Sequence, residues 1–163
     1  HYCEKARWAL DILEDAAVHR TDEQTKECYR YVELARSILT HMATSLWHTN
    51  GISTSTPIYI TKEKHVLKDS SLILRYVSDE LCKLGKPTLY PTPEVEELVV
   101  YFDQTLGVHA RRYIYWMLFS SDEMTDGLKQ CWLRGQTGLA RWIQRHFFGS
   151  IQALATAGMQ IKE

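Results

Sequence analysis

The sequence predicts a small α/β unit, a proline-rich connector and an all-helical unit, and three observations lead to this fold class. A strand–turn–strand pattern followed by a helix lies within residues 58–82. Beyond residue 94 the apolar residues recur only at helical spacing. The segment between these regions, residues 84–93, holds three of the chain's four prolines, which is typical of a linker. The predicted units are therefore residues 1–83 and 94–163, joined by residues 84–93.

The first fifty residues are predicted to be mainly helical. Apolar side chains recur at helical spacing over residues 2–16, with the charged side chains mostly on the other face. Residues 18–21 are expected to form a short strand. Residues 29–47 are predicted to form one helix or two, and Asn50-Gly51 is a turn signal.

A hairpin is predicted next, with strands at residues 58–61 and 66–68 and a helix from Ser70 to about Cys82. Pro57 stands at the start of the first strand, because proline cannot donate to a sheet ladder, and Thr56 before it is expected to be extended. Asp69 and Ser70 precede the helix, where unpaired N–H groups attract anions. We therefore expect the hairpin to bring a proline corner and a carboxylate–hydroxyl pair together around a small peptide-like anion.

The second half is predicted to be helical throughout. Residues 94–119 have the pattern of one long helix, and residues 124–148 give further helix rich in aromatic side chains. No internal repeat or low-complexity tract is present.

Length, composition and charge indicate a folded protein and limit the kinds of partner that it is expected to have. The chain has 163 residues, enough for one good core or two small ones, and it is 45% hydrophobic, as folded proteins are. The formal net charge is -1 with scattered basic residues, so we expect no nucleic-acid partner. The longest apolar runs, residues 98–102 and 113–119, are too short to cross a bilayer, so we expect no membrane partner.

The cysteines favour a reducing, cytoplasmic setting. There are four of them, without a C-x-x-C motif or tight spacing, which argues against both a zinc site and a disulfide framework. No metal site is predicted.

At four places the chain resembles the cytosolic glutathione transferases. YCEKARWAL at residues 2–10 is similar to the family's first helix, and Thr56-Pro57 to its cis-proline step. VLKDSSLILRY at residues 66–76 resembles its glutathione-carboxylate motif and third helix, and LYP at residues 89–91 resembles its domain junction. The resemblance covers nearly the whole chain. It implies a thioredoxin-like N-terminal domain followed by a helical C-terminal domain.

The chain also departs from the family's pattern. The catalytic Ser, Cys or Tyr is expected one residue upstream of His1, and the family's central first strand and its late helix have no counterpart. The resemblance therefore implies an internal fragment, or a truncated product, of a larger protein. In such a fragment the strands that flank the missing one would carry unpaired backbone groups.

The resemblance assigns the glutathione site to Thr56, Pro57, Asp69 and Ser70. A cis Pro57 would turn the Thr56 backbone toward the ligand's cysteine, and Asp69 and Ser70 would hold the γ-glutamyl end. The alternative for Asp69 and Ser70 is a simple helix N-cap worth about 1 kcal/mol. No Glu or Gln lies three residues after Ser70 or Ser71, so a capping box does not explain the pair.

Two further sets of residues have a functional and a structural interpretation. Cys3 lies in the predicted first turn, where the helix dipole favours a thiolate, so it is a weak catalytic candidate, although the family's corresponding position is more often structural. Tyr113, Trp116 and Met117 would line a pocket for a hydrophobic co-substrate in this family, but aromatic side chains at helical spacing are equally typical of plain core.

The resemblance implies that the chain binds glutathione and promotes attack of its thiolate on an electrophile or a disulfide, in a protein that commonly forms homodimers. The alternative is a non-catalytic module of the same fold that docks other proteins. Retention of Asp69 and Ser70 favours ligand binding, whereas the long insert at residues 23–47 favours a partner surface. A glutaredoxin-type thiol exchanger is disfavoured by the absence of C-x-x-C.

Overall fold

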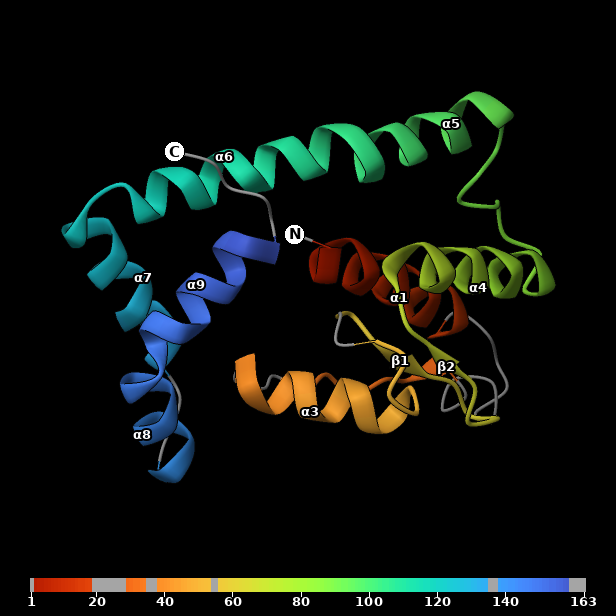
Figure 1. Cartoon of the computed structure of the whole chain (residues 1–163). Coiled ribbons are helices and arrows are strands. Elements are labelled where there is room, and N and C mark those ends of the chain that lie inside the picture. The colour runs from red at the N-terminus through yellow and green to blue at the C-terminus, as the bar shows by residue number, and fades with distance from the viewer. Residues whose placement is uncertain (1, 19–28, 35–37, 54–55, 135–137, 159–163) are drawn as a thin grey trace. The chain divides into compact units, whose positions relative to one another are not determined.

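The structure is a computed structural model, and it describes residues 2–18, 29–34, 38–53, 56–134 and 138–158 (Figure 1). The chain divides into two compact units. Unit 1 comprises His1–Arg36 and Thr40–Thr92, and unit 2 comprises Ser37–Leu39 and Pro93–Glu163.

Unit 1 contains a β-hairpin and three helices in the part of the chain that the structure describes. The helices are α1 (Tyr2–Val18), α3 (Ile38–His48) and α4 (Ser70–Lys83). The strands β1 (Tyr59–Ile60) and β2 (Val66–Leu67) are antiparallel, with Tyr59 opposite Leu67 and Ile60 opposite Val66. The predicted hairpin and the helix after it are confirmed, although the strands are shorter than expected. In Figure 1 the hairpin lies between α1 and α4 on one side and α3 on the other.

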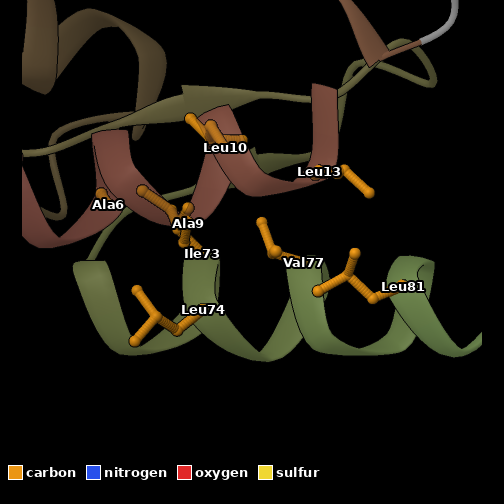
Figure 2. Packing of buried hydrophobic residues seen from close by; sticks show 8 residues of the cluster. All are labelled: Ala6, Ala9, Leu10, Leu13, Ile73, Leu74, Val77 and Leu81. Carbon is orange, nitrogen blue, oxygen red and sulfur yellow. The ribbon is translucent and has the colours of Figure 1, made fainter. Parts of the chain in front are cut away.

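The core of unit 1 lies between α1 and α4 (Figure 2). Both helices present apolar residues three and four apart, so that one stripe of each helix is buried against the other. Fully burying a Leu, Ile or Val side chain contributes roughly 1.5–3 kcal/mol, which makes this contact the main source of stability in the unit. The buried residues are Ala6, Ala9, Leu10 and Leu13 of α1 with Ile73, Leu74, Val77 and Leu81 of α4.

The start of the predicted connector is bound to α4. The hydroxyl oxygens of Ser78 and Thr88 lie 2.5 Å apart, and the Leu89 N–H donates to the Ser78 hydroxyl at 3.2 Å. Leu89 and Tyr90 pack against the core cluster. The connector therefore belongs to unit 1 as far as Thr92.

Two predictions for the first half are wrong. Val18 is the last residue of α1 and not the start of a strand, and the rest of that predicted strand, residues 19–21, lies outside the described residues. The helix predicted to begin at Tyr29 is not continuous, because residues 30–34 have no helical structure. Tyr29 and Tyr31, two residues apart, both pack against the core. Helix α3 supplies only the later part of the predicted helix.

Unit 2 is helical in the part of the chain that the structure describes. Its helices are α5 (Pro93–Tyr101), α6 (Gly107–Phe119), α7 (Asp122–Leu133), α8 (Gly138–His146) and α9 (Phe148–Gly158). The long helix predicted over residues 94–119 is confirmed as one helical run, but a π-helical turn, η1 (Phe102–Leu106), joins α5 to α6. Pro93 begins α5, at the position where its missing N–H would be unpaired in any case.

The helix predicted over residues 124–148 is divided. It comprises α7 and α8, and Phe148 already belongs to α9. Helix α7 begins with a side-chain cap, because the Met124 N–H donates to the Ser121 hydroxyl at 3.2 Å. The buried Gln144 amide of α8 donates to the Trp132 carbonyl at 2.9 Å, which ties α8 to α7.

No described helix is both long and apolar enough to span a membrane.

Candidate functional site

Unit 1 contains a pocket of about 580 Å³, within the usual size range of sites for small ligands. Three helices and two non-helical segments form its walls. The lining residues are Cys3, Ala6, Arg7 and Leu10 of α1, residues 30–34, Thr44, Ser45 and His48 of α3, residues 56–62 and Ile73 of α4.

Three of the predicted site residues meet in this pocket. Cys3 comes from the first turn of α1, and Thr56 and Pro57 come from the corner before β1. The Thr56–Pro57 peptide bond is cis, as the resemblance implied. Cys3 and Thr56 are exposed and Pro57 is half-buried, so a ligand in the pocket can reach all three.

Asp69 and Ser70 are placed differently. Asp69 is the N-cap of α4, and its carboxylate accepts the N–H groups of Ser71 at 2.6 Å and Leu72 at 3.4 Å. Ser70 is buried at 6% exposure. Neither residue lines the 580 Å³ pocket. Asp69 therefore serves as a helix N-cap, which was the alternative to ligand binding. The binding role of Asp69 and Ser70 stays a prediction.

The pocket also brings together basic side chains that sequence reasoning missed. Arg7, Arg30 and Lys62 line it, against one acidic lining residue, Glu33. Arg7 also pairs with Glu4 of α1 at 2.5 Å. The excess of positive charge suits an anionic ligand. No local signal could have indicated this set, because its members come from three separate segments of ordinary composition.

The wall formed by residues 30–34 is held to the helices by tyrosine hydroxyls. Tyr29 donates to Glu80 of α4 at 2.6 Å, and Tyr31 donates to Asp11 of α1. Burial raises the pKa of Tyr31 above its ordinary value, and the hydrogen bond to Asp11 raises it further, so this phenol stays protonated at neutral pH. The segment therefore has a fixed place beside the pocket although it belongs to no sheet of the described chain.

Tyr113, Trp116 and Met117, predicted to contact a hydrophobic co-substrate, lie on α6 in unit 2. Their spacing places them on one face of the helix, and the rings of Tyr113 and Trp116 stack with centroids 6.0 Å apart. All three are exposed, at 62%, 46% and 39%, so they are not core residues of unit 2. Their role toward a co-substrate stays a prediction.

The described residues contain no group of three His, Cys, Asp or Glu side chains arranged to hold a metal ion. Among the residues that the structure describes, Cys3, Cys82 and Cys131 are free cysteines that form no disulfide.

No protein-family model, curated protein or solved structure matches the chain.

Proposed function

We propose that the chain is a glutathione transferase-like protein whose unit 1 is a thioredoxin-like domain that binds glutathione. One observation carries the proposal: Cys3 and Thr56-Pro57, more than fifty residues apart in the sequence, line the same pocket. In the resembled family the corresponding segments hold the cysteine part of the tripeptide.

The chemistry of the pocket supports an acidic peptide ligand. Glutathione carries two carboxylates and one ammonium group, and the basic lining residues Arg7, Arg30 and Lys62 complement that charge. The backbone N–H and C=O groups of Thr56, beside the cis-proline, would exchange hydrogen bonds with the tripeptide.

The proposed reaction is attack of the glutathione thiolate on an electrophilic carbon or on a disulfide. A carbon–sulfur bond forms while the leaving group departs with the electron pair, or a mixed disulfide forms while a thiolate is released. The N-terminal end of α1 would stabilise the glutathione thiolate through its dipole and N–H groups. Asp69 and Ser70 would position the γ-glutamyl end, which contributes orientation and not chemistry.

The test is titration calorimetry of glutathione with wild type, Ser70→Ala and Ser71→Ala. Ser71 is the matched control, because it lies in the same first turn and keeps its backbone N–H bond to Asp69 after truncation. We expect wild type and Ser71→Ala to bind alike and Ser70→Ala to bind about tenfold more weakly, the effect of losing a hydrogen bond to a charged group. Equal binding by all three removes Ser70 from the site, and no binding by wild type refutes the proposal.

The alternative function is a non-catalytic module that docks other proteins. Two observations favour it. Asp69 is engaged as a helix cap, away from the pocket. In addition, Leu98, Phe102 and Leu106 recur every four residues along α5 and η1 and are about half exposed, which is more apolar surface than a helix facing only water needs.

A further inference from the structure

We draw no further inference here: the strongest candidate, the exposed basic and aromatic surface patch of α8 around Arg141, Trp142 and Arg145, supports none, because nothing in the part of the chain that the structure describes shows what covers it.

Discussion

At the residue scale, Asp69 shows how one side chain can serve either a helix or a ligand. The sequence placed it before an apolar run and left both roles open. In the structure its carboxylate accepts two N–H groups of α4, which satisfies part of the donors that every helix start leaves unpaired. A ligand carboxylate at the start of α4 would therefore compete with the Asp69 carboxylate for the same backbone N–H groups.

The phenols of Tyr31 and Tyr76 make the free energy of unfolding depend on pH in the alkaline range. Burial raises the pKa of both phenols, and acidic neighbours add to the effect: Asp11 for Tyr31, and Tyr59 and Glu80 for Tyr76. A group whose pKa is higher in the folded state than in the unfolded chain stabilises fully below its unfolded pKa, and this contribution is lost as the pH rises.

We therefore expect the free energy of unfolding to fall as the pH rises above about 10, by at most about 1.4 kcal/mol per pH unit for each tyrosine. Lys83 acts in the same direction, because Glu80 raises its pKa. Urea unfolding between about pH 9 and 11 measures the slope. Tyr76→Phe, which removes one of the two phenols with a raised pKa, should reduce it. An identical slope in wild type and Tyr76→Phe would contradict the assignment.

At the scale of elements, the α1–α4 pair shows the strength of helical periodicity as a signal. The apolar residues at helical spacing over residues 2–16 were predicted to share one face of the first helix, and four of them, Ala6, Ala9, Leu10 and Leu13, are buried in the cluster with α4. Leu13 and Val77 are almost fully buried in this contact, at 1% and 0% exposure.

Truncating a side chain in this contact should lower the free energy of unfolding much more than truncating a side chain on the opposite face of α1. We expect Leu13→Ala to lower the free energy of unfolding by about 2–5 kcal/mol, because it removes transfer energy and leaves a cavity. Ile12→Ala, its neighbour at 48% exposure, should cost about 1 kcal/mol or less. Chemical denaturation of both variants gives the comparison, and equal losses would show that α1 packs through a different face.

The segment at residues 30–34 is the element for which the same reasoning failed. Its apolar residues also fit a helical template, and the prediction therefore extended a helix back to Tyr29. In the structure Tyr29 and Tyr31 bond to different helices, Glu80 on α4 and Asp11 on α1, and residues 30–34 have no helical structure. Short segments of mixed periodicity are decided by such tertiary contacts.

At the scale of the whole molecule, the chain divides into two compact units, and unit 2 leaves many apolar side chains exposed. Its exposed residues include Leu98, Phe102, Leu106 and Tyr113 along the α5–η1–α6 run. Exposed apolar area of this extent favours association, and we propose that this run forms the contact of the homodimer that the resemblance implies.

We expect the chain to self-associate in a concentration-dependent manner through this run. The double variant Leu98→Glu/Leu106→Glu should raise the dimer dissociation constant by at least about a hundredfold, because it places charges in an apolar contact. Sedimentation equilibrium measures the change, with Ile52→Glu, at 71% exposure in unit 1, as the control. A monomeric wild type, or equal effects of both substitutions, would exclude this run as the interface.

The sequence by itself determined the hairpin, the start of α4 at Asp69, the buried stripe of α1 and the helical character of the second half. These features depend on spacing and hydrogen bonding within a few residues, so a local pattern records them. Only the tertiary structure decided that Cys3, Arg30 and Pro57 line one pocket, that residues 30–34 are not helical, and that Asp69 and Ser70 do not line that pocket. Each of these outcomes depends on contacts between segments distant in sequence, and packing between such segments leaves no periodic trace in the chain.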